Sequence, residues 1–351
     1  MNNSTRRKIL LVRTDRLGDL VLTTPAIKAV RDAYPDAYIA MIVRPYGELV
    51  VKDNPYLDEV IVYDKSGLHR SAIATIRFAL RLRKAGFDRA IIFHPTNRMH
   101  IIAYIANIPR RVGYDNRLSF LLTDRIKNLK HEGKKHERDY TLDLLKALGI
   151  ESDEKELYVA VDNNARSDIG QILSNHGIMI KDRLVTLHPG ASCISKIWPS
   201  ERFAKLADTL IEKHNVKIAI IGGKEKRDLF CVDSVKKFMR KQAIYFKGTL
   251  DIKGLAALLK RSTLFISNDS GPVHIATAVG TPVVDIFGRN QPGLSPVRWG
   301  PLGKKDIVIH KDVGCKNRCF AHNCEKNFAC LAAVSVDDIY TAIQSMGLFY
   351  P

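Results

Sequence analysis

The sequence alternates short aliphatic runs with longer amphipathic stretches, and this alternation restricts the possible folds more than any other feature. In the first half, strand-like runs occupy residues 8–13, 38–43, 59–63 and 89–94, and helical patterns occupy 20–33, 72–84 and 138–148. Continuous strands of Val, Ile and Leu followed by helices are typical of parallel sheets covered on both faces. The pattern predicts a doubly wound α/β sheet.

The second half repeats this order. Strands are predicted at 184–187, 217–221, 264–267, 282–287 and 306–309, and helices at 201–213, 225–240, 252–260, 272–279 and 336–346. A chain of 351 residues is longer than one hydrophobic core usually serves. We therefore expect two Rossmann-like domains that face a central cleft, at residues 1–165 and 166–334, followed by a last helix within 335–351.

The chain is strongly basic. Its formal net charge is +18, of which residues 1–150 carry +11 and residues 151–351 carry +7. Such a protein meets anions, which include nucleic acid, phosphorylated substrates and anionic membrane surfaces. No apolar run reaches the roughly 18 residues that span a bilayer, and the start lacks the pattern of a signal peptide. A cytoplasmic protein is expected.

Ligands of doubly wound sheets bind at the carboxyl ends of the strands, so the residues after each strand are candidates. After the first strand, the sequence has neither GxGxxG nor, anywhere, GxxxxGK[ST], which disfavours dinucleotide dehydrogenases and P-loop NTPases. Instead Gly18 and Asp19 stand at the entry of a helix. Asp19 either points into the cleft or caps the helix. Arg13, Arg16, Arg44 and Arg98 also follow first-domain strands and are candidates for binding an anionic acceptor.

Two segments of the second half are suited to a diphosphate. Residues 188–199 combine small residues with Lys196, although an ordinary surface loop with Trp198 in the core is the alternative. After the strand at 264–267, Ser270 and Gly271 precede a helix whose N-terminus favours an anion. His274 lies one turn further; alone, it is more often a core histidine. Glu225, after the strand at 217–221, is a weaker candidate for ribose binding.

Three motifs, taken together, resemble glycosyltransferase family 9, which contains the ADP-heptose:lipopolysaccharide heptosyltransferases. They are Lys8-Ile-Leu-Leu-Val-Arg with Leu17-Gly-Asp and Thr24-Pro-Ala, then Lys196-Ile-Trp-Pro, then Ser267-Asn-Asp-Ser-Gly-Pro-Val-His with Gly280-Thr-Pro. Each motif alone is loose, but they follow the family's order over nearly the whole chain.

The resemblance implies a GT-B fold, with the acceptor on residues 1–165, the nucleotide sugar on 166–334, and a C-terminal helix that packs back towards the first domain. It implies inverting transfer of a heptose from ADP-heptose to the lipopolysaccharide inner core, at the cytoplasmic face of the inner membrane. The partners would be this donor, the core acceptor and the anionic membrane surface, with no cofactor.

The resemblance also implies roles for residues. Asp19 matches the general base, and Lys196 stabilises the leaving diphosphate, with no essential metal in the site. The donor-binding set comprises Ser192, Lys196, Glu225, Asp269, Ser270, Gly271 and His274. Ser270 stands where some relatives have Thr, and residues 193–195 lack the acidic residues that some relatives carry before the lysine.

Other features allow more than one interpretation. Arg70, Arg77, Arg81 and Lys84 fall on one face of a predicted helix whose other face carries Ile73, Ile76 and Leu80; the basic face is either merely solvated or meets anionic lipid headgroups or acceptor phosphates. The basic segment 127–138 is expected to be a mobile loop. Cys315, Cys319, Cys324 and Cys330 lack the paired spacing of common zinc sites, which favours free thiols or a local disulfide.

Two other functions remain open from the sequence. One is a related transferase that uses another nucleotide sugar or glycan acceptor. The other is a non-catalytic protein that binds anions or nucleic acid. The sequence has no nucleic-acid-binding motif and no interleaved stacking aromatics, so no nucleic-acid partner is expected.

Overall fold

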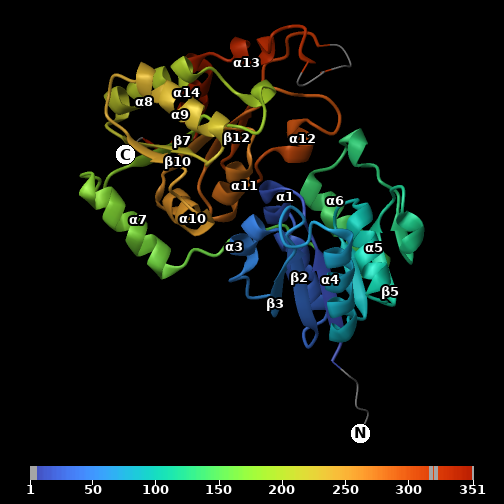
Figure 1. Cartoon of the computed structure of the whole chain (residues 1–351). Helices are drawn as coiled ribbons and strands as arrows, with labels where there is room; N and C mark the ends of the chain where they lie inside the picture. The colour runs from blue at the N-terminus through green and yellow to red at the C-terminus, as the bar shows by residue number, and fades with distance from the viewer. Residues whose placement is uncertain (1–5, 316–318, 320–322, 350–351) are drawn as a thin grey trace. The chain divides into compact units, whose positions relative to one another are not determined.

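A computed structural model describes residues 6–315, 319 and 323–349. The chain divides into two compact units, residues 1–160 and 161–351. Each unit has a six-stranded parallel sheet covered by helices (Figure 1). The division falls a few residues before the predicted boundary at 165, where helix α7 (Asn163–Asn175) already begins the second unit.

In unit 1 the strand order is β3-β2-β1-β4-β5-β6. The strands are β1 (Lys8–Val12), β2 (Tyr38–Val43), β3 (Glu59–Val62), β4 (Arg89–Ile92), β5 (Arg110–Tyr114) and β6 (Asp124–Ile126). The helices are α1 (Leu17–Val21), α2 (Thr24–Ala33), α3 (Glu48–Val51), α4 (Ala72–Ala85), α5 (Asn97–Ile105) and α6 (Glu137–Asp143), with 3-10 turns η1 (Pro45–Gly47), η2 (Ser119–Leu121), η3 (Lys130–Glu132) and η4 (Leu144–Leu148).

Unit 2 has the order β12-β11-β10-β7-β8-β9, which is the same winding read from the other edge. Its strands are β7 (Leu184–His188), β8 (Lys217–Gly222), β9 (Ile244–Lys247), β10 (Leu264–Asn268), β11 (Val283–Ile286) and β12 (Ile307–Ile309). Its other helices are η5 (Ile194–Lys196), α8 (Ser200–His214), α9 (Lys226–Phe238), α10 (Ile252–Arg261), α11 (Gly271–Ala278), α12 (Pro296–Trp299), α13 (Ala329–Ala333) and α14 (Val336–Ser345). Both units have the Rossmann order, with a switch point at their first strand.

The strands predicted from the sequence are all present, with ends shifted by one or two residues. The predicted helix at 20–33 is instead two helices, because the chain breaks between α1 and α2. There the Thr23 hydroxyl donates to the Asp19 carbonyl at 2.8 Å, and the Thr24 hydroxyl donates to the Val21 carbonyl at 2.7 Å. This break ends α1 at Val21, two residues after Asp19.

The C-terminal helix α14 packs in the core of unit 2. Val336, Ile339 and Ile343 are buried in the cluster that also holds Trp198 and Leu206. The apolar face of α14 is thus buried within its own unit, and the packing of this helix back towards the first domain, which the resemblance implies, stays a prediction. No helix in the described ranges is long and apolar enough to cross a membrane.

The capping box of α14 gives a test of this packing. The Ser335 hydroxyl accepts from the Asp338 N–H at 3.0 Å, and the Asp338 carboxylate accepts from the Ser335 N–H at 2.8 Å. Loss of an N-cap hydroxyl costs about 1 kcal/mol. We expect Ser335→Ala to lower the free energy of unfolding of unit 2 by that amount in urea titration. Ser174→Ala, at an exposed helical position, should change it by less than about 0.5 kcal/mol; equal effects would refute the capping role.

Candidate active site

The Arg13 side chain organises the carboxyl edge of the unit 1 sheet. It follows β1 directly and is buried. Its Nε donates to Asp15 at 2.7 Å, and its Nη2 donates to Asp19 Oδ1 at 2.7 Å and to Glu137 Oε1 at 3.0 Å. Nη1 donates to the Phe93 carbonyl at 3.3 Å. The sequence placed Arg13 among acceptor ligands, but its guanidinium is surrounded by protein and positions Asp19 instead.

Asp19 is a buried carboxyl group in α1, with unequal surroundings for its two oxygens. Oδ1 is held by Arg13, whereas Oδ2 forms no hydrogen bond within the described part of the chain. Burial, with the nearby Asp15 charge, raises the pKa of Asp19 to about 6 against the opposing effect of Arg13. A carboxylate with one oxygen fixed, one oxygen available and a pKa near neutrality is suited to accept a proton.

Glu137 and Lys130 complete this network and were not singled out from the sequence. The Lys130 ammonium lies 2.6 Å from Glu137 Oε1 and 4.5 Å from the centre of the Tyr114 ring. Both side chains are buried. The segment 127–138, expected to be a mobile loop, is thus anchored at both residues. The sequence signal for Glu137 was an acidic residue that follows a basic stretch and directly precedes the helix predicted at 138–148.

The other candidates of unit 1 also follow strands at this edge. Arg16 is exposed after β1, Arg44 follows β2 and lies over the Tyr46 ring at 5.1 Å, and Arg98 lies in the first turn of α5. His94, after β4, was missed. Burial lowers the pKa of His94 to about 3, so its imidazole is neutral, and its Nε2 lies 3.5 Å from the Thr14 hydroxyl.

In unit 2 the equivalent edge carries Lys196. Its ammonium lies 2.7 Å from Asp269 Oδ2 and donates to the Asp269 carbonyl at 3.3 Å. Arg289 approaches the same carboxylate at 3.5 Å. The structure therefore brings two of the donor candidates, Lys196 and Asp269, into contact, and it adds Arg289 as a second cation that the sequence did not single out. Their role in donor binding stays a prediction.

Asn268 and Trp198 fix the loop that carries Lys196. The Trp198 N–H donates to Asn268 Oδ1 at 3.0 Å, and Asn268 Nδ2 donates to the Pro189 carbonyl at 2.7 Å. The Trp198 ring is fully buried and donates from Nε1 to the Val334 carbonyl at 2.9 Å. Trp198 does fill the core, as one interpretation held, and by doing so it holds Lys196 in place.

A polar chain links the starts of α9 and α11. His188 Nε2 lies 3.4 Å from Asp228 Oδ2, and its Nδ1 lies 3.0 Å from the Ser270 hydroxyl. Burial opposes ionisation of Asp228, but hydrogen bonding from His188 and from the Gly223 N–H lowers its pKa overall. Ser270 and Gly271 begin α11, and the Ser270 side chain does not cap the helix. The first N–H groups of α11 thus have no side-chain cap.

Asp228, rather than Glu225, is the carboxylate closest to the glycine-rich loops. Glu225 is exposed and precedes α9 without capping it. A Cβ atom on Gly190 would lie 2.4 Å from Asp228 Oδ1, so a larger residue there requires the Asp228 carboxylate to move. Ser192 is exposed on the same loop, and its carbonyl accepts from Arg227 at 2.5 Å. His274 is buried in α11. The donor candidates thus share one edge, with Glu225 at its margin.

Asp285 lies within β11, next to Ser267 of β10. Its carboxyl group is buried, and neither oxygen has a hydrogen-bond partner in the described chain. Burial, together with the Asp269 charge, raises the pKa of Asp285 well above its usual value. Burial therefore favours the neutral form of this carboxyl group, on which the charges of Lys196 and Asp269 also act.

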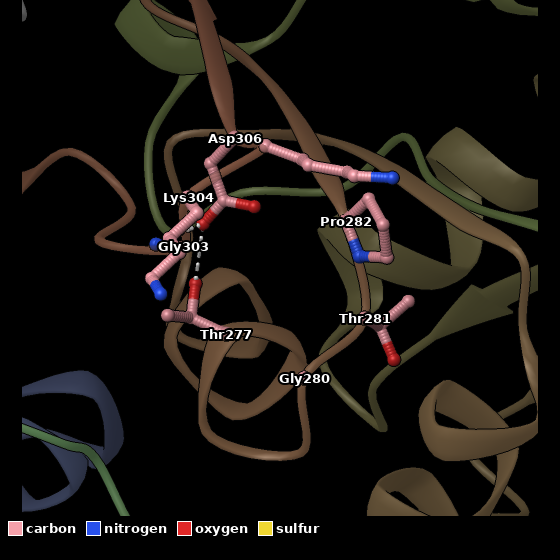
Figure 2. A pocket seen from close by; sticks show the side chains of 8 residues that line it. Thr277, Gly280, Thr281, Pro282, Gly303, Lys304 and Asp306 are labelled. Carbon is pink, nitrogen blue, oxygen red and sulfur yellow. Dashed lines mark hydrogen bonds between the residues drawn. The ribbon is translucent and has the colours of Figure 1, made fainter. Parts of the chain in front are cut away.

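A hollow in unit 2 lies at the opposite edge of the sheet (Figure 2). It is lined by Thr277, Gly280, Thr281, Pro282, Gly303, Lys304, Lys305 and Asp306. Asp306 accepts from the Thr277 hydroxyl at 3.0 Å and from the Val283 N–H at 2.9 Å. These bonds connect α11 to the start of β11, so the residues that line the hollow have a structural role.

The cysteines at the C-terminal end are free thiols, as are Cys193 and Cys231. The Cys330 thiol donates to the Gly288 carbonyl at 2.6 Å, and burial raises its pKa. In the part of the chain that the structure describes, no group of three or more His, Cys, Asp or Glu side chains is arranged to hold a metal ion.

Comparison with known proteins shows which family the chain belongs to. The model of glycosyltransferase family 9, the heptosyltransferases, matches residues 75–329, which is more than half of the chain. The chain belongs to glycosyltransferase family 9. It is therefore an enzyme, which sets aside the non-catalytic alternative.

Relatives of this family 9 enzyme match it over almost its full length. Lipopolysaccharide heptosyltransferase 3 of Escherichia coli K12 is 24% identical over 94% of this chain and 95% of its own. A family 9 glycosyl transferase of Veillonella parvula superposes with a TM-score of 0.86 at 27% identity, covering 97% of both chains. The E. coli ADP-heptose LPS heptosyltransferase II superposes at 0.78, with 19% identity over 97% and 98%. The predicted GT-B fold class is confirmed.

Asn268 provides a test of how the Lys196 loop is held. Asn268→Ala leaves the Trp198 N–H and the Pro189 carbonyl buried without partners, and each such group costs about 1–3 kcal/mol. We expect the free energy of unfolding of unit 2 to fall by at least about 2 kcal/mol in urea titration. Asn164→Ala, at an exposed site, is the matched control. A loss no larger than the control's would show that the loop is held by other contacts.

Proposed function

We propose that this enzyme transfers a heptose from ADP-heptose to the inner core of lipopolysaccharide with inversion of configuration, and that Asp19 is the general base. The observation that carries this proposal is the Asp19 carboxyl group, with Oδ1 held by Arg13 and Oδ2 available at the functional edge of unit 1. A lipopolysaccharide heptosyltransferase and a lipooligosaccharide heptosyltransferase match 94% and 97% of this chain, and this supports the substrate class.

In this mechanism, an acceptor hydroxyl attacks the anomeric carbon from the face opposite the leaving nucleotide. Asp19 Oδ2 takes the proton of that hydroxyl as the new glycosidic bond forms. Arg13 keeps the carboxylate oriented, and the raised pKa of Asp19 gives it a stronger proton affinity than a solvated aspartate. Arg16, Arg44 and Arg98 remain the proposed ligands of the anionic acceptor sugars.

The leaving ADP carries the electron pair of the broken bond, so its diphosphate needs positive partners. Lys196 and Arg289 supply charge, and the first N–H groups of α11 at Ser270 and Gly271 supply donors. Lys196 must exchange its Asp269 partner for the diphosphate, which the nearby Asp269–Arg289 contact makes possible because Asp269 keeps a cation. The donor set proposed is therefore Ser192, Lys196, Asp269, Ser270, Gly271 and His274, with Glu225 as the weakest member.

The acceptor is a glycolipid in this proposal, so the enzyme works at a membrane surface. We place it at the cytoplasmic face of the inner membrane. The charge of +11 on residues 1–150 supports contact of this part with anionic sugars or lipids.

Substitution of Asp19 tests the base. In Asp19→Asn the amide oxygen still accepts from Arg13, so the fold is retained, but no proton can be taken. We expect kcat to fall about 10²- to 10⁴-fold, measured as ADP release from ADP-heptose with a truncated core acceptor. Asp36→Asn, an exposed control, should keep full activity. Near-normal turnover by Asp19→Asn would overturn the assignment of the base. Release of UDP or GDP from the corresponding nucleotide sugars, in place of ADP from ADP-heptose, would overturn the assignment of the donor.

Glu137 gives a second, independent test through pH. The base is active when ionised, so kcat/KM should decline as the pH falls through about 6, the pKa of Asp19. The negative charge of Glu137 contributes to raising that pKa. Glu137→Gln removes this charge and keeps an oxygen for Arg13 and Lys130, so the acidic limb should move to lower pH. Glu132→Gln, on the neighbouring turn and outside the network, should leave the profile in place; an unshifted limb in Glu137→Gln would argue against Asp19 as the titrating group.

A further inference from the structure

Helix α4 presents a row of large apolar side chains to solvent. Ile73, Ile76 and Leu80 are 64%, 44% and 43% exposed. Their spacing of three and four residues puts them on one helical face. The buried face of α4 consists instead of Thr75, Phe78, Ala79 and Leu82. Helix α4 therefore exposes an apolar stripe that is not part of the hydrophobic core of unit 1.

Positive side chains flank this stripe on both sides. At 100° per residue, Arg77, Arg81 and Lys84 lie along one margin, and Arg83 lies along the other. All four are exposed, and none forms an ion pair within the described ranges of the chain. The helix contains no acidic residue. Ordinary solvated helices mix both signs, so this combination of exposed apolar and unpaired basic side chains is unusual.

The turn before α4 adds a fourth apolar side chain, Leu68, which is 78% exposed. This turn is built by Asp64, whose Oδ1 accepts from the Ser66 N–H at 3.0 Å and the Gly67 N–H at 2.9 Å. His69 closes it by stacking on Tyr63 at 4.8 Å. Leu68 is thus held outward by a turn with its own hydrogen bonds.

The same turn follows the carboxyl end of β3. In a parallel sheet, the carboxyl ends of all strands meet at one edge. The turn at Leu68 and the first residues of α4 therefore lie at the edge of unit 1 that carries Asp19 after β1.

We propose that Leu68, Ile73, Ile76 and Leu80, together with Arg77, Arg81 and Lys84, form a docking surface for an anionic lipid bilayer, here called the α4 surface. The apolar side chains enter the boundary between headgroups and acyl chains, and the cations meet lipid phosphates. A second copy of the chain is a poorer occupant, because a two-fold contact sets the same cations against each other. The purpose of the surface, which is to bring the edge with Asp19 to a lipid-linked acceptor, rests on the proposed function.

The experiment measures flotation of the full chain with vesicles of phosphatidylcholine alone or with added phosphatidylglycerol, without donor or acceptor. One variant combines Ile73→Ser, Ile76→Ser and Leu80→Ser, and another combines Arg77→Gln, Arg81→Gln and Lys84→Gln. The apolar control combines Met179→Ser, Ile180→Ser and Phe230→Ser, which are exposed in unit 2. The charge control combines Lys205→Gln, Lys226→Gln and Lys237→Gln, also exposed in unit 2.

We expect the wild type to bind vesicles that contain phosphatidylglycerol and both α4 variants to lose at least about tenfold in binding, with both controls near the wild type. Equal loss in the charge control would show diffuse attraction and overturn the proposal, as would unchanged binding of the α4 variants. Sedimentation that shows a dimer dissociated by the serine variant would assign the surface to a second copy.

Activity separates this inference from the proposed function. With a deacylated, water-soluble core acceptor, both α4 variants should turn over at the wild-type rate, whereas with the acceptor embedded in vesicles they should be slower by about the same factor as their binding. Vesicle binding without heptose transfer would refute the proposed function and leave the α4 surface standing. Heptose transfer by a wild type that does not float would refute the α4 surface alone.

Discussion

The buried guanidinium of Arg13 is the interaction on which the first unit's chemistry depends. It joins three carboxylates from two distant segments, since Asp15 and Asp19 follow β1 and Glu137 begins α6. Arg13 and Lys130 carry two positive charges against three negative ones. One proton is therefore easily held within the network, and Asp19, which has the freer oxygen, is where burial raises the proton affinity. Removing any member changes the charge balance of the others.

Unit 2 has the same strand order, but its edge carries a single lysine–carboxylate pair in place of a buried charge network. In the proposed mechanism the cation there must be exchangeable; Lys196 is paired with a single carboxylate, and its loop is fixed by neutral hydrogen bonds through Asn268 and Trp198. Burial raises the pKa of the nearby Asp285 and so disfavours a second anion beside the lysine. The two units thus use one topology for a rigid charge network and for a releasable ion pair.

The sequence was sufficient for the features that depend on periodicity. Buried parallel strands such as β1 and β10 are continuous aliphatic runs, and helices such as α8 alternate with them, so the two sheets could be predicted. Strands with few apolar residues could not: β6 has three residues of which only Ile126 is apolar, and β5 begins with two arginines that break the apolar pattern. The motif residues Lys196 and Asp269 both follow strands of unit 2, and the structure places them in contact; their ligand roles stay predictions.

Contacts between distant segments could not be predicted from the sequence. Nothing near Arg13 indicates that Glu137 lies beside it, so an acceptor ligand and a buried anchor could not be told apart. Likewise Glu225 and Asp228 lie within one turn of each other, and only the packing against Gly190 selects Asp228. The apolar residues of α4 fit either side of a helix by spacing alone, because which face is buried depends on the neighbouring elements.

The close approach of Gly190 to Asp228 has a consequence for how such chains diversify. The space that a side chain at 190 would need is already filled by the carboxylate, so neither position can change freely while the other stays. Enlarging residue 190 requires the Asp228 carboxylate to move or residue 228 to be shortened, and either change disturbs the contact with His188, which also contacts the Ser270 hydroxyl. A single steric contact therefore couples three strand ends, so a larger residue at 190 favours concerted replacement of these residues over one substitution at a time.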